Sequence, residues 1–317
     1  MPLPTTYYKT GFAVDQLPDL TGKVAIVTGG NTGLGFETVV ALANKGARVF
    51  MASRSEERAR QAIERIKADT GKDVEFLRLD LQDINQAKAA ADEFLAKKLP
   101  LNILVNNAGI MACPFGLTKD GIESQIGTNH LGHFVFATTL MPALEKGAPS
   151  RVVSVSSYGH TFCPAGGIQF DKINEPNAHN AWTRYGQSKL ANILFARGLD
   201  KRFGSKGIFA NSLHPGVVYT ELTRGPKDLY GFTGLFSFMG SIMSFGEWLI
   251  SLSPKDGALT QIFLAASNDV VDKNIRAKYF VPFAKETDDV SKYAVDDELA
   301  DRLWEWSEKT VAEKLRK

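Results

Sequence analysis

The chain has 317 residues, of which 44% are hydrophobic, and a formal net charge of +2 at pH 7. The apolar content is sufficient for a large core, and the small net charge gives no electrostatic reason to expect nucleic acid or an acidic membrane surface as a partner. The two cysteines, Cys113 and Cys163, indicate neither a disulfide framework nor a cysteine metal cluster.

Residues 1–20 carry prolines, two adjacent tyrosines and acidic residues. They lack a basic start followed by an apolar stretch, so they predict neither a signal peptide nor a membrane anchor. We expect an N-terminal arm over residues 1–20 and one domain over residues 21–317. The expected location is the cytoplasm, where both thiols stay reduced.

The most informative segment joins an apolar run, residues 24–27, to a helix-like stretch that begins near residue 38. Between them, residues 28–35 read Thr-Gly-Gly-Asn-Thr-Gly-Leu-Gly. Gly29, Gly33 and Gly35 have no Cβ atom, which permits a tight turn and a close approach of the backbone to a ligand. A strand, a glycine turn and a helix in this order aim backbone N–H groups and a helix dipole at one spot, where a diphosphate can bind. The segment therefore predicts a dinucleotide site.

A second strand, expected over residues 47–52, is followed by Ser53 and Arg54. An NAD enzyme usually has an acidic residue here, which binds the ribose hydroxyls of the adenosine half. An acid would repel a 2′-phosphate, whereas the guanidinium of Arg54 can bind one through two hydrogen bonds. This pair predicts NADP(H) as the cofactor; the alternative is a solvated arginine at the start of the next helix.

Short apolar runs alternate with helix-length amphipathic stretches along the chain. This alternation indicates an α/β fold with one doubly wound, mostly parallel sheet of seven strands and helices on both faces. Ligands of such sheets bind beyond the carboxyl ends of the strands, where the glycine turn lies. The strands are expected near residues 23–28, 47–52, 74–79, 101–105, 151–155, 208–213 and 278–281.

Four further motifs follow the glycine turn in a fixed order. They are Asn-Asn-Ala-Gly at residues 106–109, a strand that ends in Ser156 and Ser157, Tyr-x-x-x-Lys at residues 185–189, and Pro-Gly-x-x-x-Thr at residues 215–220. With the T-G-x-x-x-G-x-G turn, this order resembles the short-chain dehydrogenase/reductase family, in its retinol dehydrogenase-like or WW-domain-containing-oxidoreductase-like subgroup. The resemblance covers residues 28–220 and implies a single Rossmann domain with oxidoreductase activity.

Tyr185 and Lys189 are four residues apart and so share one face of a helix. A tyrosine has an ordinary pKa of about 10, which a nearby ammonium and the positive charge of an oxidised nicotinamide would lower. The resemblance implies that Tyr185 is the general acid/base and that Lys189 also binds the nicotinamide ribose. It further implies that Ser157 donates a hydrogen bond to the substrate oxygen, and that Asn129 supports a water near the lysine. Strand alternation puts Ser156 on the opposite face from Ser157.

The resemblance also implies a set of residues around the dinucleotide. Asp80 would meet the adenine amino group, with Leu81 beside it, and the Pro-Gly-x-x-x-Thr segment would close over the nicotinamide. The histidines form no metal pattern, and hydride transfer needs no metal, so we expect no metal site. The full cofactor set is Gly29, Asn31, Thr32, Gly33, Leu34, Gly35, Arg54, Asp80, Leu81, Asn106, Ala108, Gly109, Tyr185, Lys189, Pro215, Gly216, Val218 and Thr220.

Two segments break the alternation. The stretch between Ser157 and Tyr185 is about twice as long as is common in the family, and it would build one wall of the substrate cleft. The second segment, residues 230–252, is rich in Phe, Gly, Met and Leu. We interpret it as part of a substrate lid at about residues 221–253, over an apolar substrate. A peripheral membrane contact is the alternative; a membrane span is disfavoured, because it would cross a bilayer between two parts of one sheet.

The leading interpretation is an NADP(H)-dependent oxidoreductase that interconverts a carbonyl and an alcohol on an apolar small molecule by hydride transfer. One alternative is a reductase of carbon–carbon double bonds with the same fold. The other is a non-catalytic dinucleotide-binding protein with a regulatory role. The sequence indicates no particular oligomeric state.

Overall fold

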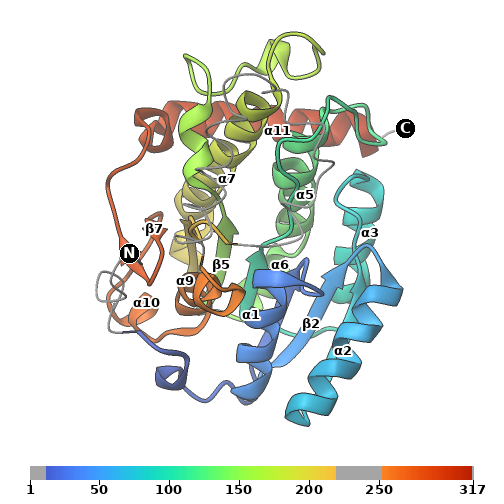
Figure 1. Ribbon diagram of the computed structural model, residues 1–317, viewed down its shortest axis with the longest axis vertical. Helices are drawn as coiled ribbons and strands as arrows, with labels where there is room; N and C mark the ends of the chain where they lie inside the picture. The colour runs from blue at the N-terminus through green and yellow to red at the C-terminus, as the bar shows by residue number, and fades with distance from the viewer. Residues whose placement is uncertain (1–11, 219–251, 316–317) are drawn as a thin grey trace, which may run out of the picture.

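One sheet of eight strands forms the centre of the computed structural model, which describes residues 12–218 and 252–315 (Figure 1). The strands lie in the order β3-β2-β1-β4-β5-β6-β7-β8, and neighbours are parallel except for the antiparallel pair β7 and β8. The predicted α/β fold with a doubly wound, mostly parallel sheet is confirmed. The strands are β1 Val24–Thr28, β2 Arg48–Ser53, β3 Val74–Arg78, β4 Ile103–Asn106, β5 Ser150–Val155, β6 Ile208–Leu213, β7 Tyr279–Val281 and β8 Lys285–Glu286.

Strand β8 adds an eighth member to the seven predicted strands. Its two residues, Lys285 and Glu286, are both exposed, so no apolar alternation marks it. The turn from β7 passes through Phe283 and Ala284, whose φ angles are 65° and 57°. Hairpin turns with positive φ usually contain Gly or Asn. Because this turn contains neither, the sequence carries no signal for the hairpin.

Helices cover both faces of the sheet, because successive strand side chains point to opposite sides. Helices α1, α2 and α9 share a core with side chains such as Val27 and Met51, whereas α3, α5, α7 and α11 share one with Ile26 and Phe50. The α-helices are α1 Gly33–Asn44, α2 Glu56–Thr70, α3 Ile84–Ala96, α4 Ser124–Ile126, α5 Gly132–Thr139, α6 Met141–Lys146, α7 Ala181–Phe203, α9 Pro254–Ala266, α10 Asp269–Asp272 and α11 Asp297–Leu315. A π-helical turn, η3 Gly127–Leu131, precedes α5, and short 3-10 turns are η2 Val14–Gln16, η4 Tyr158–Phe162, η5 Phe170–Lys172, η6 Gly204–Lys206 and η9 Lys292–Val295.

The segments at both described ends pack against the sheet's helices. Before β1, Leu17 and Leu20 are buried. At the other end, α11 (red in Figure 1) lies across α7 and α5. It buries Leu303 and Trp304, and the ring of Trp304 lies 4.9 Å from that of Phe134 on α5. The last helix therefore forms part of the core.

The order of the strands reverses at the β1–β4 pair, because β1 lies between β2 and β4. Doubly wound sheets bind ligands at this point, beyond the carboxyl ends of their strands. The glycine turn follows β1 and the Asn-Asn-Ala-Gly turn follows β4, so the two predicted cofactor motifs meet there. Thr220 and residues 221–251 of the predicted lid lie outside the described residues. Among the described helices, none is long and apolar enough to cross a membrane.

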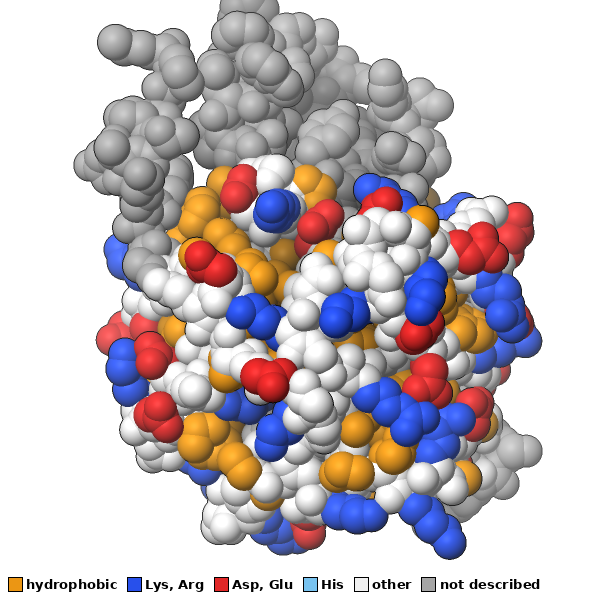
Figure 2. All heavy atoms as spheres, turned by 90° about the horizontal axis from the view of Figure 1, so that it is seen from below, with side chains coloured by type: hydrophobic (Ala, Val, Ile, Leu, Met, Phe, Trp, Pro, Cys, Tyr) orange, Lys and Arg blue, Asp and Glu red, His pale blue; other side chains and the backbone are white. Residues whose placement is uncertain are grey.

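Charges of both signs are mixed on the face that Figure 2 shows. Acidic and basic side chains alternate there, with small apolar areas between them. This mixture agrees with the formal net charge of +2.

Candidate active site

The turns after β1 and β4 are fastened together by Thr28, the last residue of β1. Its hydroxyl accepts hydrogen bonds from the backbone N–H groups of Asn107 and Ala108, both at 2.9 Å. Its proton goes to the closest acceptor, Nε2 of His133, at 2.9 Å. The other ring nitrogen, Nδ1, lies 3.0 Å from the carbonyl oxygen of Asn129 and therefore donates to it. The two predicted cofactor turns thus form one unit above a neutral histidine.

The first of these turns depends on its glycines. Gly29 and Gly33 have φ angles of 64° and 55°, in the left-handed region that other residues disfavour. A Cβ atom on Gly35 would collide with the carbonyl oxygen of Gly29 and would lie 2.6 Å from Nδ2 of Asn107. Thr32, the N-cap of α1, makes no side-chain capping bond, so N–H groups of the first helical turn remain available to an anion. These features fit a diphosphate.

A hollow of about 580 Å³ lies beside the turn, between the start of α1 and helix α2. Its lining includes three of the predicted cofactor residues, Asn31, Thr32 and Gly33. Two arginines of α2, Arg58 and Arg65, also line it. The size of the hollow and its two arginines, which outnumber the one carboxylate of Glu37, suit the phosphate-bearing half of a dinucleotide.

The predicted ligand of a 2′-phosphate, Arg54, directly follows β2 at the same edge of the sheet. Arg54 is exposed, and within the described ranges it makes no ion pair, so its guanidinium is available to an anion. It does not line the hollow, whereas Arg58, one helical turn further on, does. Sequence reasoning missed Arg58, although its spacing of one turn from Arg54 could have indicated it.

Tyr185, Ser157 and Lys189 meet beyond the carboxyl end of β5. Tyr185 and Lys189 lie one turn apart on α7, with Nζ of Lys189 5.7 Å from the centroid of the tyrosine ring. The Tyr185 hydroxyl is hydrogen bonded to Ser157, which caps the N-terminus of η4. Nζ of Lys189 donates to the carbonyl oxygen of Val155 at 3.0 Å. The structure therefore brings three of the four predicted catalytic residues into one cluster.

Burial controls the ionisation of this cluster. It raises the pKa of Tyr185 to about 12, although the hydrogen bond with Ser157 acts to lower it. It also lowers the pKa of Lys189 to about 8. The sequence predicts that Lys189 and an oxidised nicotinamide together lower the pKa of Tyr185. In the protein without a cofactor, the pKa of Tyr185 is raised instead. The reason is that removing a phenolate from water outweighs its stabilisation by the nearby groups of the chain.

Ser156 and Ser157 point in different directions, as strand alternation predicts. The hydroxyl of Ser156 is buried and donates to the carbonyl oxygen of Lys189 at 2.7 Å. Oγ of Ser157 instead accepts from the N–H of Gly159 at 3.0 Å and is bonded to Tyr185. Ser156 therefore supports helix α7, and Ser157 is the serine beside the tyrosine.

His160 holds the backbone of Ser157. Its Nδ1 donates to the carbonyl oxygen of Ser157 at 2.7 Å, and its Nε2 accepts from the N–H of Ser291 at 3.2 Å. Burial lowers the pKa of His160, which keeps the ring neutral and both bonds intact at neutral pH. Sequence analysis left this histidine without a contact, because its partner Ser291 lies far along the chain.

Asn129, the fourth predicted catalytic residue, lies in η3 and is fully buried. Its Oδ1 accepts from the N–H of Ile110 at 2.8 Å, and its Nδ2 donates to the carbonyl oxygen of Ile110 and to Oγ of Ser188, both at 2.9 Å. A Cβ atom on Gly109 would lie 3.0 Å from Oδ1 of Asn129 and 3.4 Å from Nζ of Lys189. Asn129 and Lys189 thus flank the same point of the backbone. Support of a water near the lysine stays a prediction.

Three further predicted cofactor residues lie at or near this edge. Asp80 and Leu81 follow β3, and the Asp80 carboxylate accepts from the N–H of Gln82 at 3.0 Å. Asn106 ends β4 beside Ser154 of β5 and is buried, with no hydrogen-bond partner for its amide among the described residues. Their contacts with the dinucleotide stay predictions.

The segment predicted to close over the nicotinamide is described as far as Val218. Gly216, which follows Pro215, has a φ of 90°, and Val218 pairs with Leu252 through a parallel bridge. Val218 also packs, together with Leu34 of the glycine turn, against the first turn of α9. The segment therefore lies next to the glycine turn.

Apolar side chains surround the mouth of the candidate site. Tyr158, Phe162 and Val217 are 60%, 48% and 55% exposed. Trp182, one turn before Tyr185 on α7, meets the rings of Phe162 and Tyr185 edge-to-face, at 6.2 and 6.3 Å between centroids. A cluster of large, solvent-exposed apolar side chains indicates a binding surface. Sequence analysis did not single out Trp182, although its helical spacing from Tyr185 could have indicated it.

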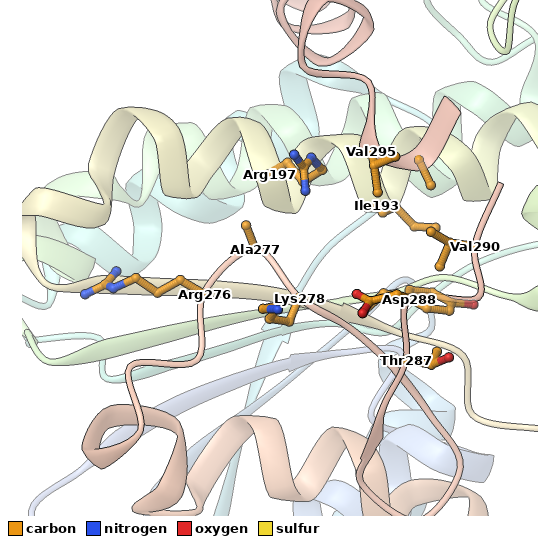
Figure 3. A pocket seen from close by; sticks show the side chains of 11 residues that line it. Ile193, Arg197, Arg276, Ala277, Lys278, Thr287, Asp288, Val290 and Val295 are labelled. Atoms are coloured by element: carbon orange, nitrogen blue, oxygen red, sulfur yellow. The ribbon is translucent and has the colours of Figure 1, made fainter. Parts of the chain in front are cut away.

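A second hollow, of about 180 Å³, lies between α7 and β7 (Figure 3). It is two turns of α7 away from Tyr185, at Ile193, and it also contacts the segment around β7. Its three cations are each paired with a carboxylate, so they offer no uncompensated charge to a ligand. These pairs are Arg197 with Asp297 at 2.6 Å, Arg276 with Asp200 at 3.1 Å, and Lys278 with Glu286 at 2.6 Å.

Metal ligands do not gather in the part of the chain that the structure describes. No group of three or more His, Cys, Asp or Glu side chains there could hold a metal ion. Cys113 and Cys163 are both free and half-buried, and burial raises the pKa of each thiol.

Known proteins share both the sequence and the fold of this chain. A sequence model of the family described as short chain dehydrogenase matches residues 23–169. The chain is 43% identical to the short-chain dehydrogenase/reductase drtF of Aspergillus calidoustus, over 95% of this chain and 96% of that protein. It is 40% identical to retinol dehydrogenase 11 of Mus musculus, over 92% of this chain and 86% of that protein. A solved structure of an uncharacterized protein from Mycobacterium paratuberculosis has a TM-score of 0.73 and 31% identity, and covers 96% of this chain and 98% of its own.

Proposed function

The chain belongs to the short-chain dehydrogenase/reductase family, in its retinol dehydrogenase-like subgroup, and from this we propose that it is an NADP(H)-dependent enzyme that interconverts a carbonyl and an alcohol on an apolar small molecule. The observation that carries the proposal is the cluster of the buried Tyr185 and Lys189 with Ser157, beside the turns that Thr28 joins. Members of the family are oxidoreductases that bind a nicotinamide dinucleotide.

Tyr185 supplies or removes the proton in the proposed reaction. Hydride transfer at the reacting carbon is the chemistry that a nicotinamide would supply when bound. In reduction, the Tyr185 hydroxyl donates its proton to the oxygen of the former carbonyl; in oxidation, its phenolate takes the proton of the alcohol. The positive charges of Lys189 and of an oxidised nicotinamide favour the phenolate that oxidation requires.

Ser157 stabilises the oxygen on which charge develops. A hydroxyl can accept two hydrogen bonds and donate one. Oγ of Ser157 accepts from the N–H of Gly159 and is hydrogen bonded to the Tyr185 hydroxyl, so its position is fixed, and a substrate oxygen bound beside it would take over its proton. A donor held in place before the reaction stabilises a developing alkoxide without a reorganisation cost.

The preference for NADP(H) rests on basic side chains near the glycine turn. Arg54 follows β2 in place of an acid, and Arg58 lines the hollow that also contains Asn31 and Thr32. A 2′-phosphate would lie beside Arg58 if bound in the hollow and beside Arg54 if bound directly after β2, whereas NADH has no 2′-phosphate for either guanidinium.

The preference for an apolar substrate rests on the mouth of the site. Tyr158, Phe162 and Val217 are exposed next to Ser157 and the predicted nicotinamide segment, and Trp182 lies above Tyr185. An apolar substrate would cover these side chains on binding. A relative that carries the name retinol dehydrogenase supports an alcohol of this kind.

Turnover of a small panel of carbonyls and alcohols tests the proposal. Apolar and polar members with the same reacting group are compared, each with NADPH or NADP⁺ and with NADH or NAD⁺. We expect the highest kcat/KM for apolar members with the phosphorylated cofactor. A preference for NADH would refute the cofactor assignment. Reduction of an enone at its carbon–carbon double bond, without turnover of any carbonyl, would support the alternative reductase instead.

A further inference from the structure

The loop that follows the Asn-Asn-Ala-Gly turn is held by side chains and not by secondary structure. Asn129 binds both the N–H and the carbonyl oxygen of Ile110. Oε1 of Gln125 accepts from the N–H of Ala112 at 2.9 Å, and Nη2 of Arg184 donates to the carbonyl oxygen of Cys113 at 3.1 Å. Ala112 has a φ of 46°, which a residue with a side chain keeps only when its surroundings enforce it. Residues 110–113 are therefore fixed from outside.

Two of the same side chains also hold the start of helix α7. Nε2 of Gln125 donates to the carbonyl oxygen of Ala181, the first residue of α7, at 3.0 Å. Nη1 of Arg184 donates to the carbonyl oxygen of His179 at 2.5 Å. Gln125 and Arg184 thus each bridge the loop of residues 110–113 and the entry to the helix that carries Tyr185.

A buried carboxylate fixes the arginine in turn. Glu123 is 2% exposed and Arg184 is 7% exposed, and Oε1 of Glu123 lies 3.3 Å from Nε of Arg184. The second oxygen of Glu123 accepts from the N–H groups of Gln125 and Ile126, both at 3.0 Å. The guanidinium also lies 5.6 Å from the ring centroid of Phe115. Arg184 therefore donates from Nη1 and Nη2 to two carbonyl oxygens while its Nε faces Glu123 in an ion pair, which the single ammonium of a lysine cannot do.

We propose that Arg184 and Gln125 are positioning residues of the reaction: they hold the loop of residues 110–113 at a fixed distance from the first turn of α7. The inference rests on the proposed function. Arg184 directly precedes Tyr185, and the loop directly follows Gly109, which lies against Lys189. A substrate whose oxygen reaches Tyr185 must fit between these two segments. Their separation then decides which face of the substrate carbonyl is presented to the hydride.

Product stereochemistry tests this role, because a merely structural contribution would not change it. A prochiral apolar ketone is reduced with NADPH, and the ratio of product enantiomers is measured with kcat, KM, the NADPH dissociation constant and the melting temperature. Arg184→Lys keeps a positive charge opposite Glu123 but gives up the carbonyl oxygens of Cys113 and His179. We expect a lower enantiomer ratio, a raised KM and a loss of roughly 10- to 100-fold in kcat/KM, with NADPH binding unchanged.

Two further variants separate positioning from folding. Gln125→Met removes the hydrogen bonds by which Gln125 joins the loop of residues 110–113 to the start of α7, and it leaves no buried charge. Like Arg184→Lys, it should lower the enantiomer ratio. Arg202→Lys is the matched control, since Arg202 also lies on α7 but pairs with Asp301 at 3.0 Å, away from the candidate site. It should leave the ratio unchanged.

The possible outcomes distinguish this inference from the proposed function. A wild-type protein without turnover of any carbonyl would refute both. An active wild type whose enantiomer ratio survives in Arg184→Lys and Gln125→Met would refute the inference alone. So would variants that lose melting temperature and NADPH affinity while the ratio stays the same.

Discussion

Tyr185 is a protonated phenol at neutral pH in the protein alone, because burial raises its pKa to about 12. This form can donate a proton during reduction without any further change. Oxidation needs the phenolate, and therefore needs positive charge close to the ring. Lys189 supplies part of that charge from 5.7 Å, although burial lowers its own pKa to about 8.

Arg54 gives a prediction at the residue scale. Arg54→Ala should raise the KM for NADPH by about 10- to 150-fold, which corresponds to the roughly 1.5–3 kcal/mol of a hydrogen bond to a charged group. The KM for NADH should not change, because NADH has no 2′-phosphate. The control is Arg60→Ala on α2, the helix that follows Arg54, since Arg60 is exposed and paired with Glu56 at 2.5 Å. Equal losses with both cofactors would contradict the assignment.

Motif spacing predicts individual catalytic residues but not the residues that hold them. Tyr185, Lys189 and Ser157 stand at positions that the family's motifs mark, and the structure brings them together. No motif includes Arg184 or His160. Their hydrogen-bond partners, Cys113 and Ser291, lie far away in the sequence and become neighbours only in the fold. Long-range contacts of this kind cannot be derived from periodicity.

At the scale of elements, the strand–turn–helix unit around β1 depends on close packing without side chains. Gly35→Ala should abolish dinucleotide binding, because the new Cβ would collide with the carbonyl oxygen of Gly29. The NADPH dissociation constant, measured by fluorescence titration, checks this expectation.

Gly71→Ala is the matched control for that substitution. Gly71 caps α2 with a φ of 70° and has no atom near its absent side chain. The replacement should cost about 1 kcal/mol of stability through its left-handed backbone, with unchanged NADPH binding. If Gly35→Ala bound NADPH as tightly as the wild type does, the glycine turn after β1 would not be the dinucleotide-binding site.

Elements marked by a continuous apolar run could be predicted from the sequence, and those without such a run could not. Strands β1 to β7 contribute buried side chains to the core. Their observed bounds agree closely with the ranges expected from the sequence. Strand β8 consists of the exposed pair Lys285 and Glu286, and pairing with β7 alone defines it. The π-helical form of η3 is likewise set by its packing and not by a local motif.

At the scale of the whole molecule, the histidines link folding to pH, because burial lowers the pKa of each of the five. Burial lowers the pKa of His130 to about 3 and those of His133 and His214 to about 4. The unfolded chain binds protons at these residues near its ordinary pKa of about 6.5, whereas the folded protein does not. Their stabilisation is therefore fully present above about pH 6.5 and is lost as the pH falls towards about 4.

The free energy of unfolding should fall steeply over this range. Each histidine contributes a slope of up to about 1.4 kcal/mol per pH unit, so three give about 4 kcal/mol per unit. Urea unfolding at several pH values between neutrality and pH 5 measures the slope. His133→Gln should lower the slope by up to about 1.4 kcal/mol per pH unit, since one proton site is removed. A slope that is the same in wild type and His133→Gln would show that His133 is not buried as a neutral ring.

Replacement of Tyr185 by Phe tests whether this residue is the proton donor and acceptor of an NADP(H)-dependent reaction. The two quantities to measure are kcat and the NADPH dissociation constant. The substitution removes the hydroxyl and keeps the ring against Trp182 and Lys189. We predict a fall in kcat of about 10²- to 10⁴-fold with unchanged NADPH affinity, because only the proton transfer is lost. A variant that keeps more than about a tenth of the wild-type kcat would contradict the account, since that exceeds what loss of a general acid/base allows.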